Sequence, residues 1–147
     1  GNHKKDLIEY VDDVIEGMKS GMFLYFAHPD HFMLWYRNEG NLLSWAVKKI
    51  CEASIKYDVP LEYNLCRPRK FRSLDGNAIA YPNHSFWEIA ALYKIKVVIG
   101  VDAHEPAAFE DEEMMGESIT YLKSMGFCLI DPSSRFKRNK NLTTTNK

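Results

Sequence analysis

Stretches with helical spacing of apolar residues alternate with short apolar runs along residues 6–131, and this alternation constrains the fold more than any other feature. Such an order is typical of α/β proteins with a parallel sheet, whose strands are buried on both faces. The pattern predicts helices over about residues 7–18, 43–54, 84–93 and 110–125, and strands over 22–27, 60–64, 97–101 and 127–130.

Turn and capping residues support the proposed boundaries. Gly21 and Gly126 are placed to end the first and last helices, and Asn83 is a suitable N-cap for the third. Residues 65–82 contain two Pro, one Gly and several basic side chains, so we expect a loop there.

Composition excludes several classes of protein. The 147 residues carry a net charge of -1, which gives no general attraction to nucleic acid or anionic membranes. No apolar run approaches the roughly 20 residues of a membrane span, and no secretory signal is present. The three Cys form no CxxC pair, so we expect no disulfide framework and a cytoplasmic location.

Polar residues that can carry chemistry follow three of the predicted strands. They are His28-Pro29-Asp30-His31 after the first, Asn64 and the basic cluster 67–72 after the second, and Asp102-Ala103-His104 after the third. In parallel α/β proteins the carboxyl ends of the strands lie at one edge, where ligands bind. Imidazole and carboxylate are ligands for zinc, iron or manganese, so a metal site is expected at this edge.

Each of these residues also has a purely structural interpretation. A single His after a strand is more often a hydrogen-bonded structural residue than a ligand, although two such strand ends together favour a metal site. His31 is either a loop residue or a partner of a ligand, and His84 is expected at the surface. The basic cluster either faces solvent or supplies an Arg that binds phosphate oxygens.

Five segments resemble the later motifs of the PHP-family histidinol phosphatases. They are residues 26–30, 61–64, 69–70, 81–82 and 99–104, in order within a similarity that runs from about Met22 to Ile130. The resemblance implies a distorted (β/α)7 barrel with a multinuclear metal site that uses zinc, manganese or iron. It also implies hydrolysis of a small phosphate ester, histidinol phosphate, in histidine biosynthesis.

The resemblance carries roles to particular residues. His28, Asp102 and His104 fall at metal-ligand positions. Arg69 falls at the family's arginine, a candidate catalytic and substrate-binding phosphate clamp. Glu62 and Asn64 fall in the strand that shapes the pocket, with Asn64 expected to bind substrate. The resemblance assigns no residue to protonate the leaving alcohol, for which the candidates are His31 and a residue in the absent half of the barrel.

The sequence also departs from the family pattern. It contains no HxH motif, with which family members begin, and Val101 stands where the family usually has Ser. We therefore expect the C-terminal half of such a barrel, with about four parallel strands in residues 1–134 and a basic polar tail at 135–147. By itself this half is expected to bind metal weakly or not at all, to be inactive, and to self-associate through its open edges.

Three other functions stay open at this point. The first is a related PHP phosphoesterase that acts on nucleotides. The second is a non-catalytic metal-binding or regulatory module, and the third is a structural interaction domain. A substrate panel, and metal binding compared with turnover, would distinguish them.

Overall fold

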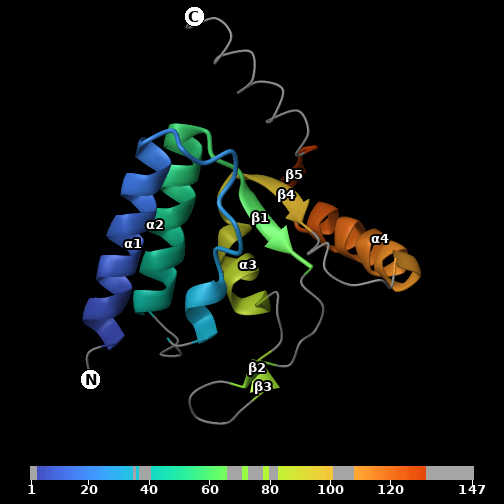
Figure 1. Ribbon diagram of the computed structural model, residues 1–147, viewed down its shortest axis with the longest axis horizontal. Helices are drawn as coiled ribbons and strands as arrows, with labels where there is room; N and C mark the ends of the chain where they lie inside the picture. Colours follow the sequence, from blue (N-terminus) through green and yellow to red (C-terminus); the bar gives the residue numbers. More distant parts are fainter. Residues whose placement is uncertain are drawn as a thin grey trace, which may run out of the picture.

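The computed structural model describes residues 3–34, 36, 41–65, 71–72, 78–79, 83–100 and 108–131, and it has a mixed α/β fold (Figure 1). The helices are α1 (His3–Lys19), α2 (Asn41–Tyr57), α3 (His84–Ala90) and α4 (Ala108–Ser124), with a 3-10 helix η1 (His31–Leu34). In the view of Figure 1, α1 and α2 lie to the left of a small parallel sheet and α4 lies to its right. The strands are β1 (Leu61–Asn64), β2 (Phe71–Arg72), β3 (Ala78–Ile79), β4 (Lys96–Gly100) and β5 (Cys128–Leu129).

The parallel sheet has the strand order β1-β4-β5. β1 pairs with β4 in the register Leu61 opposite Val97 through Asn64 opposite Gly100. β4 pairs with β5 through Lys96 opposite Cys128. The arrowheads of β1 and β4 point the same way in Figure 1, so their carboxyl ends lie at one edge of the sheet, as expected from the sequence.

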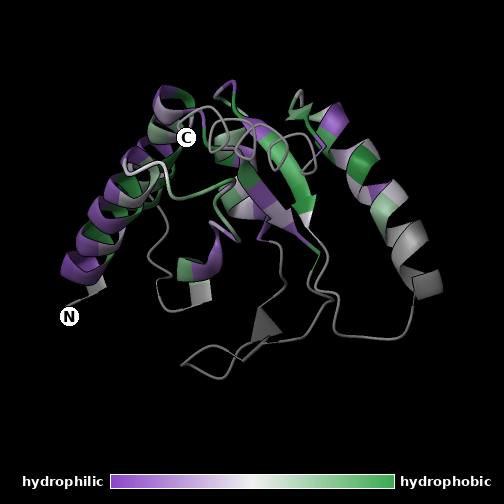
Figure 2. Ribbon diagram, turned by 45° about the horizontal axis from the view of Figure 1, so that its top comes forward, coloured by the Kyte–Doolittle hydropathy of each residue, from purple (hydrophilic) through white to green (hydrophobic). Residues whose placement is uncertain are grey.

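All four predicted helices are present, although α3 ends at Ala90 instead of continuing to about residue 93, and α1 and α2 bury the predicted faces. In α1, Leu7, Val11, Val14 and Met18 are all at most 4% exposed, and Gly21 follows the helix with a φ of 75°. Polar residues cover the outer side of α1, while its apolar side faces the rest of the molecule (Figure 2). α1 packs along α2, whose buried residues include the predicted stripe from Leu43 to Ser54.

An aromatic cluster joins α3 and α4 to the sheet. The Tyr63 ring of β1 lies 5.1 Å from the Trp87 ring of α3 and 6.3 Å from the Tyr121 ring of α4. Trp87 and Phe86 are fully buried. Because side chains alternate along a strand, this cluster places the neighbours of Tyr63, Glu62 and Asn64, on the other face of β1.

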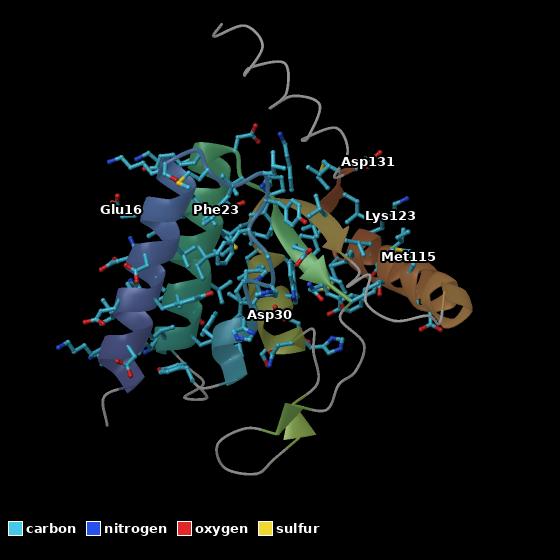
Figure 3. The ribbon with its side chains drawn as sticks, viewed as in Figure 1. Glu16, Phe23, Asp30, Met115, Lys123 and Asp131 are labelled. Carbon is cyan, nitrogen blue, oxygen red and sulfur yellow. The ribbon has the colours of Figure 1, made fainter. Side chains whose placement is uncertain are left out.

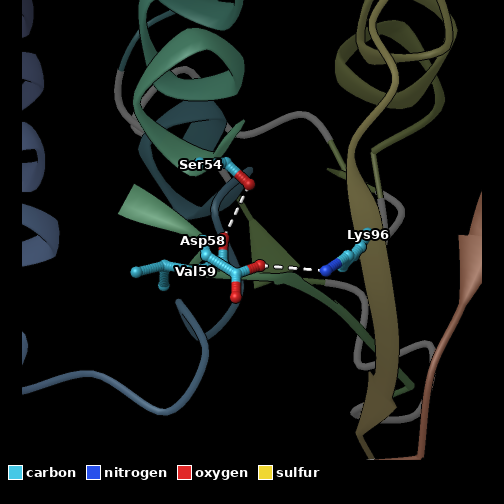
Figure 4. Close-up of polar contacts among 4 residues, drawn as sticks. All are labelled: Ser54, Asp58, Val59 and Lys96. Atoms are coloured by element: carbon cyan, nitrogen blue, oxygen red, sulfur yellow. Dashed lines mark hydrogen bonds and ion pairs between the residues drawn. The ribbon is translucent and has the colours of Figure 1, made fainter. Parts of the chain in front are cut away.

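The turn between α2 and β1 is closed by side-chain contacts (Figure 4). Ser54 Oγ donates to the Val59 carbonyl oxygen at 2.6 Å. Lys96 Nζ at the start of β4 contacts Asp58 Oδ1 at 3.0 Å. This ion pair is exposed, so it contributes little stability, but it joins the starting ends of the two paired strands.

The prediction of a buried strand over residues 22–27 is wrong for most of that run. Met22 is 82% exposed and Phe23 is 38% exposed, and pairing is limited to an isolated parallel bridge between Phe26 and Leu61. The register explains this result, because Phe26 lies opposite Leu61, the first residue of β1, so that residues 22–25 precede the start of that strand. Pro60, beside the bridge, also lacks the N–H that a longer ladder needs.

Two short strands are described within residues 65–82, where the sequence predicted a loop. β2 and β3 pair antiparallel, with Phe71 opposite Ile79 and Arg72 opposite Ala78. The predicted tail at 135–147 lies outside the described residues. Among the described residues, no helix combines the length and the apolar character needed to span a membrane.

Candidate functional site

His28 lies at the carboxyl edge of the sheet, beside β1. After α1 the chain crosses to the sheet and runs down beside β1 to η1 (Figure 1). Phe26 N donates to the Pro60 carbonyl oxygen at 2.8 Å, and Glu62 N donates to the Phe26 carbonyl oxygen at 2.9 Å. His28 then adopts a φ of 33°, and its side chain is exposed. The imidazole is therefore accessible to a ligand from solvent.

Glu62 is a buried carboxylate in the middle of β1. Glu62 is only 6% exposed. Its Oε1 atom accepts hydrogen bonds from two donors. His28 N donates to it at 3.2 Å and Asn64 Nδ2 donates at 2.8 Å. These bonds offset part of the cost of burying a carboxylate and tie the strand to the start of the loop at residues 28–31.

Gly100, at the end of β4, provides the space for this carboxylate. A Cβ atom at residue 100 would overlap the Glu62 carboxyl group. A glycine in a strand often marks such a close approach. The Glu62 side chain thus reaches from the backbone of residue 28 to the end of β4, which is followed in the sequence by Asp102 and His104.

Asp30 is a second buried carboxylate, near the start of α3 (Figure 3). It is 1% exposed, and Oδ2 accepts a hydrogen bond from Asn83 N at 2.6 Å. Burial raises the pKa of Asp30 to about 6, and the Asn83 N–H opposes that shift. Within the described residues, the buried atoms Asp30 Oδ1 and Trp87 Nε1 have no hydrogen-bond partner.

His31, the candidate proton donor, begins η1 next to His28. The two ring centroids are 5.1 Å apart, and the His31 side chain is exposed. Partial burial and the charge of His28 lower the pKa of the His31 imidazole. The structure thus brings His28 and His31 together at the same edge of the sheet.

Of the other predicted site residues, only Asn64 lies within the described part of the chain. Asn64 is 4% exposed and its amide contacts Glu62. Asp102, His104 and Arg69 lie outside the described residues. Within the residues that are described, no group of three or more His, Cys, Asp or Glu is arranged to hold a metal ion.

The donor chemistry at this edge suits a divalent cation. The imidazole of His28 is exposed, and the sequence after β4 supplies a carboxylate and a second imidazole at Asp102 and His104. Imidazole and carboxylate together bind zinc, iron and manganese. The predicted ligand set is therefore compatible with the part of the site that the structure describes.

His84 and the cysteines take positions away from this edge. His84 is exposed at the start of α3, as predicted, and its Nδ1 lies 3.1 Å from Tyr121 Oη. Cys51 is a buried free thiol in α2, and Cys128 is an exposed free thiol in β5. Cys66 lies outside the described residues.

The roles of Glu62, Gly100 and Asp30 were not predicted from the residues themselves. The sequence did carry a signal for the first pair, since an acidic residue within a buried strand needs partners and a glycine at a strand end indicates close packing. Asp30 carried no comparable signal, because its burial depends on how α3 packs behind the loop.

Comparisons of this chain with models of known protein families, with curated proteins and with solved structures found no match.

Proposed function

We propose that the protein is a metal-dependent phosphomonoester hydrolase whose most suitable substrate is histidinol phosphate. This chain would form the C-terminal half of a PHP-type (β/α)7 barrel. His28, Asp102 and His104 would hold the cation, and Arg69 and Asn64 would contact the substrate.

One observation carries the proposal. The Glu62 carboxylate contacts the backbone of His28 on one side and packs over Gly100 on the other. The two chain segments that supply the candidate ligands, one at His28 and one after Gly100, therefore both adjoin the Glu62 carboxylate. Because β1 and β4 are parallel, β4 ends at the same edge of the sheet as β1, and the segment after Gly100 begins there.

The chain's own residues would divide the chemistry as follows. A bound divalent cation would activate water and neutralise negative charge on the phosphoryl group. The Arg69 guanidinium, with its planar set of donors, would pair with phosphoryl oxygens and hold the substrate in line. His31, whose ring lies beside that of His28, would hold the proton required by the leaving alcohol.

The test is hydrolysis by the full product of the gene with added Mn²⁺, Zn²⁺ or Fe²⁺. We expect turnover of histidinol phosphate, with a loss on the order of 10²-fold or more in kcat for Arg69→Ala. His28→Ala should lose metal and activity together. His84→Ala is the matched control, because His84 is an exposed histidine in contact with Tyr121, and it should retain full activity.

Nucleoside monophosphates are tested beside histidinol phosphate. Faster hydrolysis of a nucleoside monophosphate than of histidinol phosphate would indicate the related PHP phosphoesterase activity. Turnover of no phosphomonoester above background would contradict the proposal. Retained activity in His28→Ala would remove that residue from the metal site, and Arg69→Ala activity within a factor of about two of the parent would remove Arg69 from the phosphate site.

A further inference from the structure

We infer that Glu62 is the positioning residue for His28, and that residue 100 is glycine because the Glu62 carboxylate occupies the space of a Cβ atom there. The inference rests on the proposed function in one respect only, namely that His28 binds the cation. The inference adds Glu62, which would position the metal ligand His28 by accepting a hydrogen bond from the His28 backbone N–H.

The hydrogen-bond ladder between residues 26–28 and β1 supports this inference. Phe26 N donates to the Pro60 carbonyl and Glu62 N donates to the Phe26 carbonyl, which is the parallel pattern. Continuation of that pattern would direct His28 N to the Glu62 backbone carbonyl. His28 N instead donates to the side-chain oxygen Oε1 of Glu62. The carboxylate thus ends the ladder at His28.

The backbone of His28 changes conformation at the same position. Its φ of 33° is unusual for a residue with a side chain and carries a conformational cost. A hydrogen bond to a charged acceptor is stronger than a bond to a carbonyl, so it can offset that cost. This turn directs the chain away from β1 and leaves the imidazole exposed at the sheet edge.

Two neighbours fix the direction of the Glu62 side chain. Asn64 Nδ2, on the same face of β1, donates to the same Oε1 atom at 2.8 Å. On β4, the absence of a Cβ at Gly100 allows the carboxyl group to lie against the backbone. A side chain held on both sides places its acceptor atom accurately, and positioning partners of this kind commonly change metal affinity by 10- to 100-fold, as an order of magnitude.

The first experiment measures hydrogen exchange at the His28 amide of the 147-residue chain by NMR. Glu62→Ala removes the acceptor of the His28 N–H. Glu62→Asp keeps the carboxylate but has a shorter side chain, which moves the acceptor away from that N–H. Both substitutions should therefore accelerate exchange of the His28 amide on the order of 10-fold or more. Glu62→Gln keeps an oxygen acceptor and should stay within a few-fold of the parent. The Ser85 amide, bonded to Asn83 Oδ1, is the control and should not change.

A double-mutant cycle tests the role of Gly100. Gly100→Ala should accelerate His28 exchange in the parent, because the new Cβ displaces the carboxylate. In the Glu62→Ala background the same substitution should add nothing. Equal effects of Gly100→Ala in both backgrounds, or unchanged His28 exchange in both Glu62→Ala and Glu62→Asp, would overturn the inference.

Mn²⁺ affinity of the full gene product separates this inference from the proposed function. We expect His28→Ala to lose binding, Glu62→Ala to weaken it by about 10- to 100-fold, and Glu62→Gln to restore most of it. Unchanged affinity in His28→Ala would refute the proposed metal role of His28. A loss in His28→Ala with unchanged affinity in Glu62→Ala would refute the positioning role alone.

Discussion

Two buried carboxylates, one on β1 and one within the loop itself, connect the loop at residues 28–31 to the rest of the fold. Glu62 accepts the His28 N–H, and Asp30 accepts the N–H of Asn83. Asn83 in turn caps α3 by accepting from Ser85 N and Phe86 N. The loop that presents His28 and His31 is thereby connected to a strand and to a helix start, and a loop held at both ends suits residues that must bind a ligand precisely.

The buried thiol of Cys51 makes the stability of the fold depend on pH in the alkaline range. Burial raises the pKa of this thiol from 9.0 to about 12, with the nearby charge of Glu52 adding to the shift. Above its unfolded pKa the thiol therefore loses its proton in the unfolded chain but keeps it in the folded one. The free energy of unfolding should fall as pH rises from about 9 toward 12, by up to about 1.4 kcal/mol per pH unit.

Urea unfolding at about pH 8 and about pH 10 measures this effect. Cys51→Ala should remove part of the alkaline loss of stability, besides a constant cost of the lost side chain. Cys128→Ala is the matched control, since that thiol is exposed. Equal pH dependence in the parent and in both variants would show that Cys51 ionises alike in the folded and unfolded states.

At the scale of elements, the two margins of the sheet are short. Within the described residues, β5 pairs with β4 over two residue pairs, and the segment at Phe26 pairs with β1 through a single bridge. Met22 and Phe23, next to that bridge, are the exposed apolar residues nearest to this margin in the sequence. Short edge strands limit unwanted pairing, but exposed apolar side chains beside them favour association.

We therefore predict that the 147-residue chain self-associates through the margin at residues 22–26. Sedimentation velocity over a wide range of concentration should show dimers or larger species, and Met22→Lys should shift them toward monomer. Leu92→Lys is the control, because Leu92 is 79% exposed, close to the 82% of Met22, but follows α3. A strict monomer at high concentration, or equal effects of the two substitutions, would contradict this prediction.

Apolar periodicity predicted the elements whose burial depends mainly on their own sequence. The helix with its apolar stripe from Leu7 to Met18 and the strand at 97–101 could be predicted without knowing which elements they pack against. The run at 22–27 was misjudged because its pairing depends on where β1 begins, which is set by the turn at Asp58 and Pro60. Composition cannot provide that register.

For the whole molecule, the sequence predicted the parallel topology that brings two of the candidate segments to one edge of the sheet, and the metal site itself stays a prediction. Parallel topology alone placed His28 and the end of β4 on one side of the sheet. The contacts that organise this edge come from Glu62, Gly100 and Asp30, and they depend on strand order and on the packing of α3. Only the three-dimensional arrangement could identify them, because their partners lie 34 to 53 residues away in the sequence.

We expect the candidate ligands from the loop at residues 28–31 and from the segment after β4 to meet around a cation at this edge of the sheet. The most direct measurement is paramagnetic broadening of amide resonances by small amounts of Mn²⁺, because it detects even the weak binding that we expect of the 147-residue chain alone. We predict selective broadening at His28 and Gly100, abolished by His28→Ala, with none at His84 or Lys123. Complete absence of broadening would place metal binding beyond this half of the barrel and would contradict the role of His28 in this chain. Broadening confined to other sites, or unchanged in His28→Ala, would contradict the account.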